Sequence, residues 1–161
     1  IFYATSTGNT QNIAEDIAKE LENIETFDIS SKDISEVLKY EKLIFGISTW
    51  GSGEVQDDWD DIWEDFSSLD LSNKTVALFG LGDQDSYGDE FADALGLMYE
   101  SVTNSGAKVI GFTSTQSYEY DESKAEVNGK FCGLVIDEDN QEELSTQRIK
   151  EWTSEIKNEI L

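Results

Sequence analysis

The stretch "IFYATSTGNTQNIAED" (Ile1–Asp16) combines a strand, a turn and a helix within sixteen residues. Residues 1–4 form an apolar run of strand length, whereas Ile13, Ile17 and Leu21 recur with the spacing of a helix face. The pattern predicts a strand that passes through a tight turn into a helix. The turn holds only small, uncharged residues: Thr5, Ser6, Thr7, Gly8, Asn9 and Thr10.

The same alternation of strand and helix patterns continues along the chain. Short connections between such segments are typical of βαβ units with right-handed crossovers, which place helices on both faces of a parallel sheet. We therefore predict a single domain over residues 1–161, an α/β/α three-layer sandwich that is doubly wound around a five-stranded parallel sheet. The predicted strands are 1–4, 26–29, 42–48, 75–80 and 108–113, with a further one at 131–136. The first predicted helix begins near Thr10. Further helices are predicted at 55–66, 91–105 and 147–161, with a weaker one at 35–40.

A polar segment, Ser114–Lys130, interrupts this pattern after the fifth strand. Extended structure is expected to resume at Phe131. We interpret the segment as an excursion inserted between two parts of the sheet.

The net charge of −24, without any histidine, limits the partners of this chain. Such a surface repels phosphate backbones and anionic lipids, so we expect no nucleic acid and no membrane as partners. It attracts basic protein surfaces, although acidity that serves solubility alone remains the alternative. Cys132 is the only cysteine, which excludes an intrachain disulfide and fits a cytoplasmic location. We expect it to be a buried strand residue.

The turn after the first strand has the composition of an anion cradle. In a doubly wound sheet, ligands bind at the carboxyl ends of the strands, where a helix N-terminus offers unpaired N–H groups and a partial positive charge. The hydroxyl and amide groups of residues 5–10 add donors. The turn lacks the lysine of a nucleotide triphosphate loop and the glycines of a dinucleotide loop, which leaves a terminal monophosphate. Ordinary N-capping by threonine or serine is the alternative.

Two further turns at the same sheet edge contain an aromatic residue each. The first is "STWGSGEVQDDW" (Ser48–Trp59), with Trp50 among small residues, and the second is "FGLGDQDSYGDEF" (Phe79–Phe91), with Tyr87. We expect Trp50 to be less buried than Trp59 or Trp63. Two such rings can stack on both sides of a flat ring system.

The motifs T-S-T-G-N-T, T-W-G-S-G-E and G-L-G-D-Q-D-S-Y-G-D-E-F resemble those of the flavodoxins over the whole chain. The interruption before "GKFCGLVIDEDNQ" resembles the long-chain flavodoxins, whose fifth strand is split by a loop. The resemblance implies the strand order 2-1-3-4-5 and flavin mononucleotide (FMN) as cofactor, with no metal. It implies a phosphate site at Thr5, Ser6, Thr7, Gly8, Asn9 and Thr10 and a ring site at Ser48, Thr49, Trp50, Gly51, Ser52, Gly53 and Tyr87. It also implies pyrimidine contacts at Leu81, Gly82 and Asp83 and a ribityl contact at Asp139.

The resemblance implies the function of a low-potential one-electron carrier. Such a carrier is expected to be a monomer and to have no substrate-converting active site. The chain is expected to pass electrons between redox proteins with basic docking surfaces, of the ferredoxin-NADP reductase and 2-oxoacid oxidoreductase types. FMN would alternate between oxidised, neutral semiquinone and anionic hydroquinone states, and the Gly51 carbonyl would accept the flavin N–H of the semiquinone. A quinone reductase of the same fold is the main alternative. A phosphorylation-dependent receiver domain is set aside, because Thr5–Thr7 and Thr49–Trp50 stand where it needs acids.

The stretch "DDWDDIWED" (Asp57–Asp65) contains six acids directly after the tryptophan turn. It predicts either a solvated helix face, since acids stabilise a helix N-terminus, or a docking rim for a basic partner.

Overall fold

A computed structural model describes residues 1–161, and its centre is a sheet of mostly parallel strands. Strands β2 (Phe27–Asp28), β1 (Phe2–Tyr3), β3 (Lys42–Trp50) and β5 (Thr75–Leu81) lie side by side in that order. The fifth place is shared by β6 (Lys108–Ile110) and β10 (Leu134–Ile136). β6 pairs with Thr75–Ala77 and β10 with Phe79–Leu81, so one strand position is filled twice along the same edge. The predicted doubly wound order and the split fifth strand are therefore confirmed.

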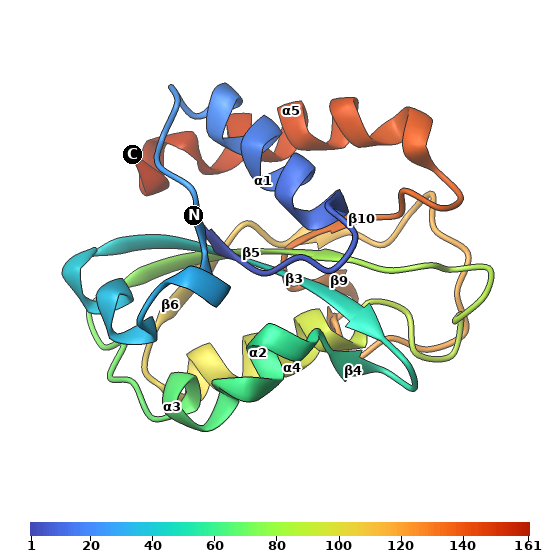
Figure 1. The fold of residues 1–161 in the computed structure, drawn as a ribbon. Helices are drawn as coiled ribbons and strands as arrows, with labels where there is room; N and C mark the ends of the chain where they lie inside the picture. The colour runs from blue at the N-terminus through green and yellow to red at the C-terminus, as the bar shows by residue number, and fades with distance from the viewer.

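Helices cover both faces of this sheet (Figure 1). α1 (Asn9–Glu20) and α5 (Glu142–Ile160) pack on one face, above the sheet in this view. α2 (Asp57–Asp61), α3 (Trp63–Ser67) and α4 (Asp93–Asn104) lie on the other face. Two 3₁₀ helices, η1 (Ile29–Ser31) and η2 (Ile34–Lys39), follow β2. No helix is both long and apolar enough to cross a membrane.

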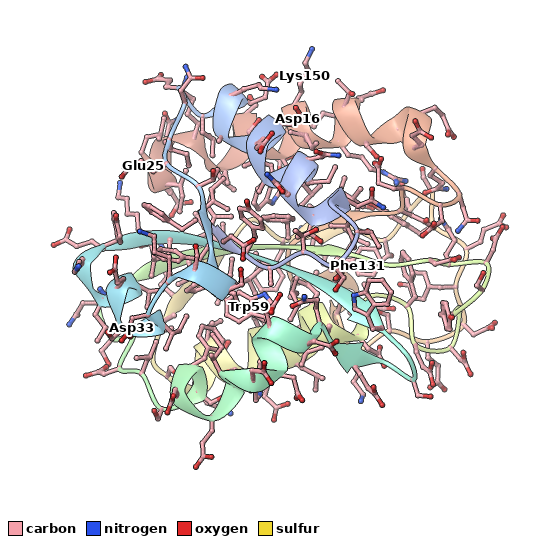
Figure 2. The ribbon with its side chains drawn as sticks, viewed as in Figure 1. Asp16, Glu25, Asp33, Trp59, Phe131 and Lys150 are labelled. Atoms are coloured by element: carbon pink, nitrogen blue, oxygen red, sulfur yellow. The ribbon has the colours of Figure 1, made fainter.

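The buried apolar side chains form two clusters, one on each face of the sheet. The cluster under α1 and α5 includes Ile13, Ile17 and Trp152, which confirms the apolar stripes read from the sequence. The cluster on the other face includes Trp59 and Phe131, which point into the space below the sheet (Figure 2). Cys132 is also fully buried there, and burial raises the pKa of its thiol to about 12. It is a core residue, as predicted.

The excursion has a small sheet of its own. β7 (Thr113–Ser114), β9 (Lys130–Phe131) and β8 (Glu126–Val127) form antiparallel pairs beside the main sheet. Extended structure does resume at Phe131, as predicted, but the predicted single strand 131–136 is wrong, because it is divided between β9 and β10. Phe131 pairs with Thr113, and the main sheet resumes at Leu134.

Several helix predictions need correction. The predicted helix 55–66 is two short helices that are broken at Ile62, whose φ of −113° is not helical. Val55 belongs instead to β4 (Glu54–Val55), which turns back antiparallel onto β3. The predicted helix 35–40 is the 3₁₀ helix η2, and α5 begins five residues before the predicted Gln147, at Glu142. The ends of α4 and α1 agree with the sequence pattern to within a few residues.

Candidate functional site

The turn between β1 and α1 leaves the start of the helix uncapped. Gly8 is the N-cap residue, it has a left-handed backbone with φ of 92°, and no side chain caps the helix. The Gly8 N–H donates instead to Thr5 Oγ1 at 2.9 Å. Glycine adopts this φ at little cost, and no atom lies within 4 Å of the place that its Cβ would occupy. The alternative reading, N-capping by threonine or serine, is wrong.

Five backbone donors at this turn have no partner in the protein. The N–H groups of residues 5, 6, 7, 9 and 10 donate no hydrogen bond, and they lie just before and at the positive end of α1. The Ser6 hydroxyl accepts from Gln56 Nε2 at 3.1 Å, so its own proton stays free to donate. Thr7 and Asn9 are exposed and Thr10 is buried. The turn therefore offers neutral donors to an anion, as its composition predicts.

The tryptophan turn is a hairpin between β3 and β4. Trp50 pairs with Glu54, and residues 51–53 make the bend, in which Gly51 and Gly53 have φ of 50° and 78°. Trp50 Nε1 donates to the buried Ser48 Oγ at 2.8 Å, which fixes the ring. The Trp50 side chain is 42% exposed, whereas Trp59 is fully buried. The predicted contrast between these two tryptophans is confirmed.

The tyrosine turn follows β5, the neighbour of β3. Leu81 lies opposite Ser48 in the sheet, so the two aromatic turns start from adjacent positions. Gly82 donates its N–H to Ile136 O at 3.1 Å, and a Cβ at this position would come within 2.9 Å of the Ala92 nitrogen. Tyr87 is 48% exposed. Trp50 and Tyr87 are thus large rings held at the surface at one edge of the sheet.

A buried polar network supports the tyrosine turn, and sequence reasoning missed it. Asp137, at the end of β10, is fully buried, and its Oδ2 accepts from Gln84 Nε2 at 2.7 Å and from Gln84 N at 3.1 Å. Asn140 Nδ2 bridges Asp137 and Asp83 Oδ1, the latter at 2.8 Å. Gln84 Oε1 in turn accepts from the Glu119 N–H of the excursion. An aspartate directly after the apolar run "LVI" is the signal that could have indicated it.

Two carboxyl groups at this end of the site have pKa values shifted in opposite directions. The pKa of Asp83 is lowered, because hydrogen bonds from Ser86 and Asn140 together outweigh its partial burial, the largest single effect. The pKa of Asp139 is raised by partial burial first, and then by the charges of Asp83 and Asp137. Asp139 is exposed beside this network and forms no side-chain hydrogen bond to the protein.

The predicted site residues therefore lie on segments that contact one another. Gln56 joins the turn of residues 5–10 to the tryptophan hairpin, and Thr49 Oγ1 accepts from Ala94 N at 3.1 Å, at the start of α4. The turn of residues 5–10, Trp50 and the tyrosine turn follow the neighbouring strands β1, β3 and β5, so they border one edge of the sheet. Such an edge, with neutral donors at one end and two rings at the other, suits a long ligand that has an anionic tail and a flat head.

Known proteins resemble this chain over nearly its whole length. The sequence profile of the family described as Flavodoxin matches residues 1–152. A flavodoxin of Synechocystis is 47% identical over 160 residues, 98% of this chain and 94% of the relative. One from Haemophilus influenzae is 41% identical over 163 residues, 99% of this chain and 94% of the relative.

A solved structure has the same fold. The crystal structure of Fusobacterium nucleatum flavodoxin bound to flavin mononucleotide superposes with a TM-score of 0.94 at 37% identity, and the match covers 99% of this chain and 96% of that one. With the family profile and the relatives above, this match shows that the chain belongs to the flavodoxin family, whose members are electron-transfer proteins.

Proposed function

We propose that this protein is a low-potential one-electron carrier that binds FMN non-covalently and has no substrate-converting site of its own. The main support is the uncapped N-terminus of α1, whose free N–H groups and neutral hydroxyls match a phosphate monoester. The FMN-bound flavodoxin of Fusobacterium nucleatum adds support from a relative of the same fold.

In this proposal the binding residues form three groups. The turn Thr5–Thr10 binds the phosphate, and Asp139 contacts the ribityl chain. Trp50 and Tyr87 stack on the isoalloxazine ring, with Ser48, Thr49 and the hairpin Gly51–Gly53 beside them. The backbone of Leu81, Gly82 and Asp83 binds the pyrimidine edge. The network under the tyrosine turn favours this role, because it fixes the donors before FMN binds.

FMN, when bound, would accept and donate electrons one at a time, and the protein would set the energies of its three oxidation states. We propose that the Gly51 carbonyl accepts a hydrogen bond from the protonated ring of the one-electron-reduced, neutral form. The positive φ of Gly51 favours glycine there, because other residues resist this conformation. The acidic surface would disfavour the fully reduced anion, which makes the second electron strongly reducing.

We propose that the partners are redox proteins with basic docking surfaces, of the ferredoxin-NADP reductase and 2-oxoacid oxidoreductase types. The carrier itself would be a monomer with a single domain, and it would act in the cytoplasm. The exposed acids of α2 and α3, directly after the tryptophan hairpin, suit such a docking rim: Asp57, Asp60, Asp61, Glu64 and Asp65. Association with a basic reductase is expected to weaken as salt rises. A response independent of salt would favour the solvated helix face instead.

The decisive experiment is titration of the FMN-free protein with FMN and, in parallel, with riboflavin, which lacks the phosphate. We expect FMN to bind far more tightly, with quenching of its fluorescence, and partial reduction to give a blue species. A steady-state assay with NAD(P)H and a quinone, without added reductase, tests the enzyme alternative. Equal affinity for the two flavins would contradict the phosphate site, and rapid turnover of the quinone would contradict the carrier role.

A further inference from the structure

A cavity of about 520 Å³ lies between the first half of the excursion and α5, away from the three turns of the proposed FMN site. Its apolar walls include Phe112, Tyr118, Leu134 and Trp152, and its basic residues are Lys130 and Arg148. This volume falls within the usual range for small-ligand pockets, which combine apolar walls with a few polar groups. None of the functions proposed above uses it.

Arg148, the only arginine of the chain, has donors that the protein leaves without acceptors. A guanidinium group has five N–H donors. Here only Nη2 forms hydrogen bonds, to Gln141 Oε1 at 2.8 Å and to Ser117 O at 3.4 Å. Its Nη1 is shielded from solvent without an acceptor, the one buried side-chain polar atom in the protein of which this is true. Buried donors are normally bonded, so this exception needs an explanation.

The surroundings of Arg148 hold it in place without an ion pair. Its guanidinium lies over the Tyr118 ring, with Cζ 4.0 Å from the ring centroid, and this contact restricts the movement of the side chain. Neither Arg148 nor Lys130 forms an ion pair, although the chain has 35 acidic residues. Glu151 and Glu155 line the same cavity, but neither lies within ion-pair distance of Arg148 or Lys130. Two unpaired cations therefore border a partly apolar cavity in a protein with a large negative charge.

We propose that this cavity binds a small organic anion, in which a carboxylate or phosphate oxyanion meets Arg148 and Lys130 and an apolar body lies against Tyr118 and Trp152. An oxyanion in the cavity gives the guanidinium a charged acceptor, which no carboxylate of the protein supplies, and arginine binds such groups through paired hydrogen bonds. The aromatic and aliphatic walls select against bare inorganic anions. The cavity shares no residue with the proposed FMN site.

The test uses the FMN-loaded protein, so that the phosphate turn is already occupied. Benzoate and phenyl phosphate serve as probes, with benzyl alcohol as the neutral counterpart and inorganic phosphate as the anion without an apolar body. Two-dimensional NMR is expected to show shifts at residues 112–118 and 144–152 with the two aromatic anions only. Arg148→Gln is expected to weaken binding about tenfold, the loss of one charge-assisted hydrogen bond.

Two further variants test the proposal even if Arg148→Gln destabilises the structure around the cavity. Lys130→Gln changes an exposed side chain of the cavity and is expected to weaken binding several-fold. Lys150→Gln removes the same charge from α5 at a side chain that projects into solvent outside the cavity (Figure 2), and binding should stay unchanged. The proposal is overturned if no shifts occur at these residues, if benzyl alcohol or phosphate binds equally well, or if Lys130→Gln has no more effect than Lys150→Gln.

Discussion

The turn of residues 5–10 leaves five backbone N–H groups without partners, whereas the tyrosine turn of residues 82–91 rests on a network bonded to a buried aspartate. Both turns follow central strands and border the same edge of the sheet. The first leaves its donors for a ligand, and the second fixes its shape through bonds within the protein. The comparison shows that one edge of the sheet can have two kinds of turn. The turn of residues 5–10 provides unpaired donors, and the tyrosine turn is held rigid by bonds within the protein.

The largest expected effect tests the unpaired donors. Thr7→Glu places a carboxylate among them, and at about 4 Å from the phosphate its repulsion of roughly 4 kcal/mol weakens FMN binding about a thousandfold. The same charge stabilises the helix N-terminus, so the urea midpoint of the FMN-free protein should not fall. Fluorescence titration measures the affinity.

Thr7→Gln and riboflavin are the controls for this change. Thr7→Gln adds similar bulk without charge and should keep most of the affinity for FMN. Riboflavin should bind Thr7→Glu and the unchanged protein alike. A similar loss of riboflavin affinity would show that the substitution distorts the turn rather than repels a phosphate.

The second effect tests the rigid support. Asp137→Ala removes the acceptor of Gln84 and Asn140 in a fully buried place, and such unpaired donors cost about 1–3 kcal/mol. We expect a loss of about 3 kcal/mol in the free energy of unfolding of the FMN-free protein, measured with urea. Asp85→Ala removes an exposed acid from the same turn and should change it little. A neutral result for Asp137→Ala would mean that the network does not stabilise the turn.

A smaller effect separates the two rings from the support beneath them. Trp50→Leu and Tyr87→Leu each remove a half-exposed ring and should weaken riboflavin binding by about 0.5–1.5 kcal/mol, without a change in stability. Trp63→Leu, a change on α3 outside the predicted site, is the matched control, and it should leave the flavin affinity unchanged. If both rings could be replaced without loss, stacking would play no part in binding.

The smallest effect concerns the pH dependence of stability. The raised pKa of Asp139 means that the folded protein binds its proton more tightly than the unfolded chain does. The contribution of Asp139 to the free energy of unfolding therefore falls as pH rises from its unfolded pKa to its folded one. Asp139→Asn should raise the free energy of unfolding at neutral pH by less than about 0.5 kcal/mol. Asp83, with its lowered pKa, contributes stability above its unfolded pKa that is lost as pH falls through the folded value. Urea unfolding from pH 3 to 7 compares the two variants, and Asp83→Asn should destabilise at neutral pH.

The sequence predicted features that a clear local pattern decides, and it missed those that join distant residues or that a local pattern leaves ambiguous. The turn of residues 5–10 and the exposure of Trp50 follow from local patterns, because composition and spacing within a few residues decide them. The contact between Gln84 and Asp137 joins residues far apart in the chain, and no local pattern reports it. The break at Ile62 was missed because the spacing of Trp59, Trp63 and Phe66 fits one helix as well as two. β4 was missed because two residues are too few for a strand pattern.

The split of the fifth strand also affects how the folded protein behaves at high concentration. An exposed sheet edge can pair with the edge of another molecule, and long flat edges promote aggregation. Here one edge consists of two three-residue pieces, β6 and β10, separated by residues that turn away into another sheet, and the other edge is the two-residue β2. Neither border offers a continuous ladder of free amides and carbonyls, so crowded copies of this protein should resist joining through their sheets.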